Sequence, residues 1–211
     1  METDILDAEE FRDLLHDEGE ALLWLRARPH TCLNPAENVS TRDCTCDNGY
    51  VYDATITGVG VIQGVKREYM DPQFGLVRVG DCRMLTMPDE IPASEMDKIV
   101  LGDRVEPQKE IVKRGATARD GLRNPYCVDL LNVYDATGDY VVGTDCVLDN
   151  NGVKWLQNAP AAGVNYGVRY EAKPLFYVLG IEIGIPRPQG TKFMPMRCLL
   201  TRIHPGARPN P

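Results

Sequence analysis

The sequence predicts a mainly β protein: a short N-terminal helix, a small antiparallel β-barrel with a zinc-type cysteine loop, and a second β module. From residue 50 onward, short runs rich in β-branched and aromatic residues alternate with Gly, Asp or Pro, which is typical of small barrels. Three of the seven cysteines fall between residues 32 and 46. With 211 residues, of which 43% are hydrophobic, the chain can bury a core as one large or two small domains.

The first segment, residues 1–27, is expected to hold an acidic amphipathic helix and a leading strand. Asp7 and Glu10 have the spacing of a capping box, and Gly19 is well placed to end the helix. Residues 21–25 are apolar without a helical gap, so we expect a strand there.

The second segment, residues 28–114, is expected to form the cysteine loop and the small barrel. Its expected strands are 51–57, 60–65, 76–79, 82–86 and 111–113. Residues 87–92 and 101–105 are interpreted as the turns and edges of that barrel.

The remainder of the chain is expected to form a connector over 115–125, a second β module over 126–185 and an extended tail over 186–211. The module's expected strands are 126–134, 140–142, 146–148, 153–155, 166–172 and 175–185. A tight hairpin is predicted at Asp149-Asn150-Asn151-Gly152, since Asn-Gly readily takes positive φ angles. The tail holds six of the fifteen prolines and is expected to become ordered only against a partner subunit.

The cysteine loop has the residues that one tetrahedral zinc ion needs. The four candidate ligands are His30, Cys32, Cys44 and Cys46. Gly49 can supply the left-handed turn of a metal-binding knuckle, and four ligands with thiolates predominating favour a structural Zn²⁺ over a catalytic one. Cys82 is the main rival to His30, and ordinary reduced cysteines in a loop are the simpler alternative.

Charge is distributed unevenly along the chain. The formal net charge is −8, and residues 1–20 hold nine acids and one base, whereas five bases and no acid follow Glu182. An acidic front and a basic end suit subunits that dock on neighbours, although solvated termini explain them equally well. The sequence has no basic patch interleaved with aromatic residues, which is the pattern that would indicate nucleic-acid recognition. The sequence shows no long apolar run or leader, so we expect a soluble protein and no membrane partner.

Catalytic patterns are missing from the sequence. It contains no Gly-x-Ser-x-Gly elbow, phosphate-binding Gly-Lys-Ser/Thr loop or His-Glu-x-x-His helix, so a non-enzymatic protein is expected. Asp139, Asp145 and Asp149 are spaced as hairpin residues rather than as a calcium loop. Three further cysteines lie in apolar strand patterns and are interpreted as small buried hydrophobes: Cys127, Cys146 and Cys198.

Four runs resemble the small β-barrel neck proteins of tailed bacteriophages, which close the head or join the portal to the tail. They are Cys-Asp-Asn-Gly-Tyr-Val-Tyr (46–52), Gly-Val-Ile-Gln-Gly-Val (60–65), Gly-Asp-Cys-Arg-Met-Leu-Thr-Met-Pro-Asp (80–89) and Ile-Val-Leu-Gly-Asp-Arg-Val (99–105). In such relatives the loop carries Cys-x-Cys and then Cys-x-x-Cys-x-Gly. Here His30 stands where the first cysteine would be, and the second pair has tightened to Cys44-x-Cys46.

The resemblance implies a structural virion protein, assembled in the host cytoplasm into a homo-oligomeric neck ring. It would contact a portal or adaptor and tail proteins, and DNA would pass through its lumen without sequence-specific binding. A second interpretation is a zinc-dependent hydrolase or nuclease-like enzyme that uses Cys32, Cys44 and Cys46, with Asp43 or Asp47 as the base. A third is a zinc-stabilised interaction module of cellular origin.

Overall fold

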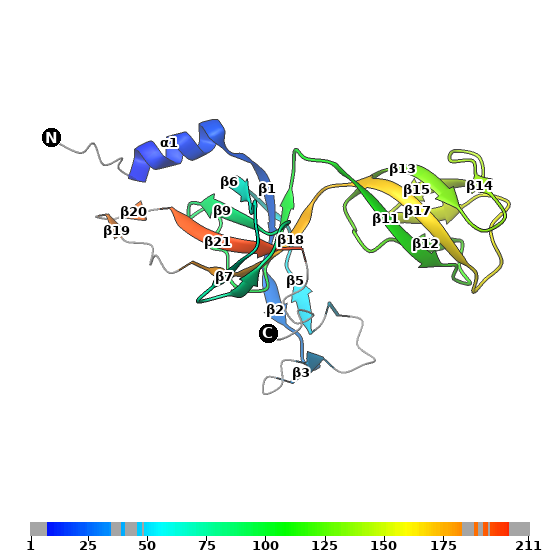
Figure 1. Ribbon diagram of the computed structural model, residues 1–211, viewed down its shortest axis with the longest axis horizontal. Helices are drawn as coiled ribbons and strands as arrows, with labels where there is room; N and C mark the ends of the chain where they lie inside the picture. Colours follow the sequence, from blue (N-terminus) through cyan, green and yellow to red (C-terminus); the bar gives the residue numbers. More distant parts are fainter. Residues whose placement is uncertain are drawn as a thin grey trace. The chain divides into compact units, whose positions relative to one another are not determined.

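The fold is mainly β with one short helix, as the sequence predicts. It is described by a computed structural model for residues 8–34, 39–40, 46–47, 49–182, 188–189, 192–193 and 195–202. Asp7, Asp43 and Cys44 lie outside these residues. The described chain divides into two compact units, one of residues 1–102 with 176–211 and one of residues 103–175 (Figure 1).

The first unit contains helix α1 (Ala8–Glu18) and most of the short strands. Its strands are β1 (Glu20–Leu25), β2 (Ala27–Pro29), β3 (Leu33–Asn34), β4 (Val39–Ser40), β5 (Tyr50–Tyr52), β6 (Ile56–Gly64), β7 (Tyr69–Asp71), β8 (Gly75–Val77), β9 (Cys82–Thr86), β10 (Lys98–Leu101), β18 (Leu175–Ile181), β19 (Pro188–Gln189), β20 (Lys192–Phe193) and β21 (Met196–Thr201).

Six of these strands close into a barrel in the order β1-β10-β18-β21-β9-β6. Strand β18 alternates buried and half-buried side chains along its whole length, so one of its faces lines the core. The barrel core is a single cluster of mostly aliphatic side chains: Leu22, Trp24, Met84, Ile91, Ala93, Ile99, Leu101, Phe176, Val178, Met196, Cys198 and Leu200.

One face of helix α1, its inner face, packs against the rest of the first unit. Leu15 is 2% exposed, Arg12 contacts Asp89 at 2.5 Å, and His16 lies 3.1 Å from Glu90. The helix ends at Glu18, directly before Gly19, as predicted. A β-carbon at Gly19 would lie only 2.2 Å from the Leu15 carbonyl oxygen, so only glycine fits.

The second unit contains two sheets. Its strands are β11 (Glu106–Lys113), β12 (Arg119–Gly121), β13 (Cys127–Tyr134), β14 (Asp139–Tyr140), β15 (Cys146–Asp149), β16 (Gly152–Trp155) and β17 (Asn165–Ala172). They form the sheets β11-β17-β13-β14 and β12-β16-β15. Strands of both sheets contribute to one core, which is what makes this unit compact.

The predicted hairpin is present between β15 and β16. Asp149 pairs with Gly152, and the positive φ angles belong to Asn150 and Asn151, the two central positions of a tight hairpin loop. Gly152 itself is required for a different reason, because a β-carbon there would lie 2.5 Å from the Asp120 carbonyl oxygen of β12.

The predicted order of segments along the chain needs correction. The barrel does not coincide with residues 28–114: β1 comes from the predicted first segment, and β18 and β21 come from the predicted second module and tail. The expected barrel strand 111–113 is part of β11 in the second unit. Residues 115–125 are not a connector between domains but carry β12, which belongs to the second unit. Within the predicted tail, β21 is a buried barrel strand. Contacts between distant segments leave no local pattern, so the sequence could not reveal that residues 103–175 interrupt the barrel.

Candidate metal centre

Two short strands bring the ends of the cysteine loop together. β2 pairs with β5, with Pro29 opposite Tyr50, and the pairing continues where the His30 amide donates to the Gly49 carbonyl oxygen at 2.7 Å. Asp47 and Tyr50 exchange two backbone hydrogen bonds, and the turn between them has Gly49 at φ +93°. This geometry supplies the glycine turn predicted from the sequence.

Three of the four predicted ligands lie in contact at this end of the hairpin. His30 Nδ1 is 3.0 Å from Cys32 Sγ, and Cys32 Sγ is 3.2 Å from Cys46 Sγ. One donor atom from each of the three residues lies within 4.8 Å of the other two, and all three side chains are half-buried. A nitrogen and two sulfur donors at such spacing could hold a metal ion.

The backbone supports this cluster of donors. The Gly49 amide donates to Cys46 Sγ at 3.2 Å, and a hydrogen bond to sulfur stabilises the negative charge that a metal-binding thiolate carries. Cys46 and Gly49 therefore act as one turn, in which the glycine both sets the backbone direction and contacts the sulfur atom.

The other two candidate ligands are placed differently. Cys44 lies outside the described residues. Cys82 is in β9, where it pairs with Gly64 and Leu200 and packs against the barrel core; it is not among the three grouped donors. Of the three cysteines predicted to be buried, Cys146 and Cys198 are fully buried, whereas Cys127 is only half-buried against the core of the second unit. Burial raises the pKa of the Cys198 thiol to about 12, consistent with an inert packing role.

The cysteine loop is attached to the barrel through Asp47. Lys98 of β10 contacts the Asp47 carboxylate at 2.5 Å, and Tyr177 of β18 donates to the same oxygen at 3.1 Å. The Lys98 ammonium also lies 3.9 Å from the centre of the Tyr52 ring. Burial, and secondarily the Asp47 charge, raise the pKa values of Tyr52 and Tyr177, so both phenols stay neutral. Nothing local in the sequence signals this attachment.

A buried carboxylate positions the start of the hairpin. Asp97 is fully buried and accepts hydrogen bonds from the Trp24 indole at 2.8 Å, from the Ala27 amide at 2.7 Å and from the Ser94 amide at 2.8 Å. The Ala27 bond fixes the first residue of β2 to the barrel. Every donor is part of the scaffold, so Asp97 is a structural group here.

Two of the aspartates considered for calcium are held by groups of the second unit. Asp145 accepts from the Val141 amide at 2.8 Å and from the Asn158 amide group at 2.8 Å, while Asp149 lies 3.8 Å from Lys154. Within the described ranges, His30, Cys32 and Cys46 are the one group of metal-ligating side chains.

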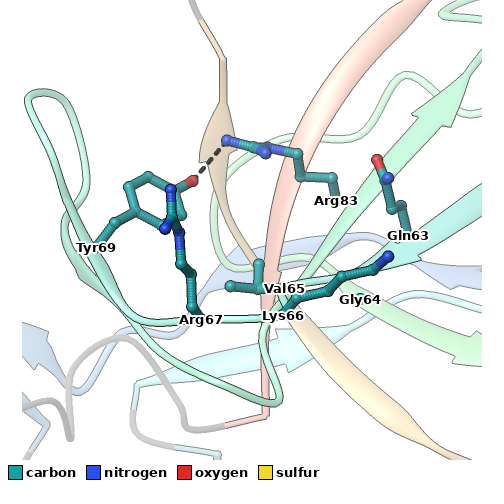
Figure 2. A pocket seen from close by; sticks show the side chains of 7 residues that line it. All are labelled: Gln63, Gly64, Val65, Lys66, Arg67, Tyr69 and Arg83. Carbon is teal, nitrogen blue, oxygen red and sulfur yellow. Dashed lines mark hydrogen bonds between the residues drawn. The ribbon is translucent and has the colours of Figure 1, made fainter.

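A surface hollow of about 450 Å³ lies elsewhere on the first unit. It is lined by Gln63, Gly64, Val65, Lys66, Arg67, Tyr69 and Arg83 (Figure 2). Arg83 is held by Glu182 at 2.6 Å and by the Tyr69 hydroxyl at 2.6 Å. Lys66 and Arg67 are exposed at its mouth and form no ion pair with a described residue.

Comparisons with known proteins add no identification. No protein-family model matches the chain, and a search of curated proteins finds no match. In the part of the chain that the structure describes, no helix has the length and apolar character needed to cross a bilayer.

Proposed function

We propose that this chain is a non-catalytic structural subunit of a tailed-phage virion, which forms an oligomeric neck ring around a DNA passage. The observation that carries the proposal is the attachment of the cysteine loop: its Asp47 is paired with Lys98 and Tyr177 of the barrel, so the loop is built into the scaffold. The resemblance of residues 46–52 and 80–89 to neck proteins supplies the biological setting.

The metal in this proposal is a structural Zn²⁺. His30, Cys32 and Cys46 supply borderline and soft donors, and Cys44, the fourth ligand of the proposal, would close the site. Around a tetrahedral zinc ion a nitrogen and a sulfur donor lie about 3.6 Å apart and two sulfur donors about 3.8 Å apart, so the spacings of 3.0 and 3.2 Å in the cluster would each widen by about half an ångström on binding. Bound zinc would stabilise the loop against unfolding. In small zinc modules the apparent binding free energy is about 10–16 kcal/mol.

In the proposed ring, one face contacts the portal or an adaptor and the other contacts tail proteins. The acidic net charge of −8 suits a lumen through which DNA slides without sequence-specific binding.

Zinc content tests the metal part of the proposal. We expect one zinc per chain, by inductively coupled plasma mass spectrometry, in protein purified without a metal-affinity tag. Cys46→Ala and His30→Ala should lose the metal, because each removes one of the clustered donors. Cys82→Ala is the matched control and should keep it, and Cys44→Ala identifies the fourth ligand. Wild-type protein free of metal would refute the zinc site.

Co-purification tests the neck part of the proposal. A tagged chain, expressed with the portal and tail proteins of the same phage genome, should retain at least one of them through size-exclusion chromatography. A stable chain that binds neither would contradict a neck role, whatever its metal content.

A zinc-dependent hydrolase is the second candidate: zinc held by Cys32, Cys44 and Cys46 would keep its fourth position open for water, the mark of catalytic zinc. Its proposed base Asp47 is already paired with Lys98, which disfavours proton abstraction there. Metal-dependent hydrolysis of a nucleic acid or ester that is abolished by Asp47→Ala would favour this candidate over the neck role.

A further inference from the structure

On one face of the second unit's larger sheet, the part formed by edge strand β11 and the adjoining Arg169 is basic and apolar, whereas Asp129, Asp139 and Glu171 lie elsewhere on the same face. Side chains directly opposite one another on neighbouring strands share a face, and Lys109 lies opposite Arg169, which lies opposite Asn132. The next row joins Ile111, Gly167 and Tyr134. The Lys109 ammonium lies 5.9 Å from the centre of the Tyr134 ring, which places both on this side.

The cations on this face, Lys109, Lys113 and Arg169, are exposed and form no ion pair with any residue that the structure describes. Ile111 stands between the two lysines on β11 and is 75% exposed, more than any other large hydrophobic side chain in the described ranges. Unpaired cations around an exposed isoleucine are complementary in charge to an acidic partner that offers an apolar side chain. We refer to Lys109, Ile111, Lys113 and Arg169 as the sheet patch.

Helix α1 presents the complementary surface. Its inner face is taken up by Leu15, Arg12 and His16, whereas Leu14 is 46% exposed. The side chains around Leu14 are acidic. Asp17 lies one helical turn after Asp13, and Glu18 lies one turn after Leu14, so these four residues are neighbours on one side of the helix. These three acids are exposed and have no ion-pair partner in the described chain. We refer to Asp13, Leu14, Asp17 and Glu18 as the helix patch.

We propose that the helix patch of one copy binds the sheet patch of a second copy, with Leu14 against Ile111 and the carboxylates against the lysines and arginine. The inference rests on the proposed assembly into a homo-oligomer and names a contact that builds it. Because the two patches differ, the contact is head-to-tail, the kind that closes into rings when the rotation between copies permits.

A second copy fits the sheet patch better than a nucleic acid does. The centre of the patch is an aliphatic side chain, which matches Leu14 and offers nothing to a phosphate backbone. The complementary acids lie on the same chain, so each copy carries both halves of the contact.

Two charge-reversal variants test the contact by complementation. The helix variant is Asp13→Lys/Asp17→Lys, and the sheet variant is Lys109→Glu/Lys113→Glu. Each alone should weaken self-association by about tenfold or more in sedimentation velocity, because like charges then face each other. Mixed one to one, the two variants should recover wild-type association. The lysines of the helix variant then face the glutamates of the sheet variant, and the other contact joins the unaltered helix patch of the sheet variant to the unaltered sheet patch of the helix variant.

The matched control is Lys66→Glu/Arg67→Glu, which makes the same charge change at exposed cations on the first unit; it should associate like the wild-type chain. Circular dichroism melts of all variants should coincide with the wild type, because every altered side chain is exposed. Wild-type self-association should also fall as salt rises.

Several outcomes would overturn the contact: a monomeric wild-type chain at high concentration, variants that associate normally, or a mixture that does not recover association. Duplex DNA binding that the sheet variant abolishes, in a chain that stays monomeric, would assign the patch to nucleic acid instead. The neck proposal is judged separately, by co-purification with portal and tail proteins, so the two can fail independently.

Discussion

At the scale of single residues, both tryptophans of the chain donate to a buried aspartate. Trp24 donates to Asp97, and Trp155 donates to Asp120 at 3.0 Å. Asp120 also contacts Arg114 at 3.2 Å, and both side chains are largely buried. The sequence could not predict either pair, since the partners lie 73 and 35 positions apart. The sequence did single out His30, Cys32 and Cys46, because cysteines and histidines that lie close together in a sequence are typical metal ligands.

Replacing Asp120 should destabilise the second unit. In Asp120→Asn, the buried Arg114 charge loses its counter-charge, which costs about 3 kcal/mol of unfolding free energy. The measurement is urea unfolding followed by Trp155 fluorescence in a Trp24→Phe background. Asp149→Asn, which alters a solvent-exposed ion pair, should change stability by less than about 0.5 kcal/mol. Equal effects of the two variants would contradict a structural role for Asp120.

Acid should weaken the fold through hydrogen-bonded carboxylates. Hydrogen bonds from the Thr137 side chain and then from Tyr140 lower the pKa of Asp135 to about 2. A carboxyl whose pKa is lower folded than unfolded adds stability above its unfolded pKa of about 4 and loses that stability as the pH falls through the folded value. We therefore expect unfolding free energy to fall between about pH 4 and about pH 2.

Thr137→Val isolates this contribution, because it removes the hydroxyl bond while the Thr137 amide bond to Asp135 remains. The pKa of Asp135, measured by NMR titration, should rise toward its ordinary value, and the loss of stability in acid should become shallower. An unchanged titration curve would show that the hydroxyl does not hold the carboxylate.

At the scale of elements, strand β17 depends on a glycine beneath an aromatic ring. A β-carbon at Gly167 would lie 2.4 Å from Tyr134 Cζ, so the ring of β13 occupies the space that a side chain would need. Local signals predicted β13, β17 and the hairpin at 149–152 well, since strand propensity and turn chemistry are short-range. They missed β10: residues 98–100 carry no expected strand, because burial there depends on distant strands. Residues 101–105, interpreted as turns and edges of the barrel, lie outside strands except for Leu101.

Gly167→Ala should destabilise the second unit by about 1–3 kcal/mol, the usual cost of overpacking. Gly121→Ala in β12 is the control, because a β-carbon there would meet nothing within 4 Å. Chemical denaturation of both variants checks the difference. Combining Gly167→Ala with Tyr134→Ala should give less than the sum of the single effects; strict additivity would show that ring and β-carbon do not compete.

At the scale of the whole molecule, the second unit is an insertion in the barrel. Its first and last strands are paired, with Glu106 opposite Ala172, so the chain enters and leaves the unit at neighbouring positions. The sequence predicted two β bodies but assigned them consecutive segments. The assignment failed because barrel strands β10 and β18, neighbours in space, are separated by more than seventy residues.

Residues 103–175 should fold by themselves. They contain a complete core and enter and leave through paired strands, which is how tolerated inserted domains are connected. We expect the isolated fragment to unfold cooperatively in urea and to show dispersed amide signals in NMR. A fragment without cooperative unfolding would show that the second unit needs the barrel.

Strand β21 also determines when the barrel can be completed during translation. It lies between β18 and β9, yet it is the last barrel strand to leave the ribosome. Until residues 196–201 emerge, β9 and β18 each present an open edge, the feature that makes nascent β proteins prone to aggregate. Residues 103–175 have been synthesised well before that point. The inserted unit can therefore fold first, and the barrel, whose strands come from before and after it in the sequence, can fold last.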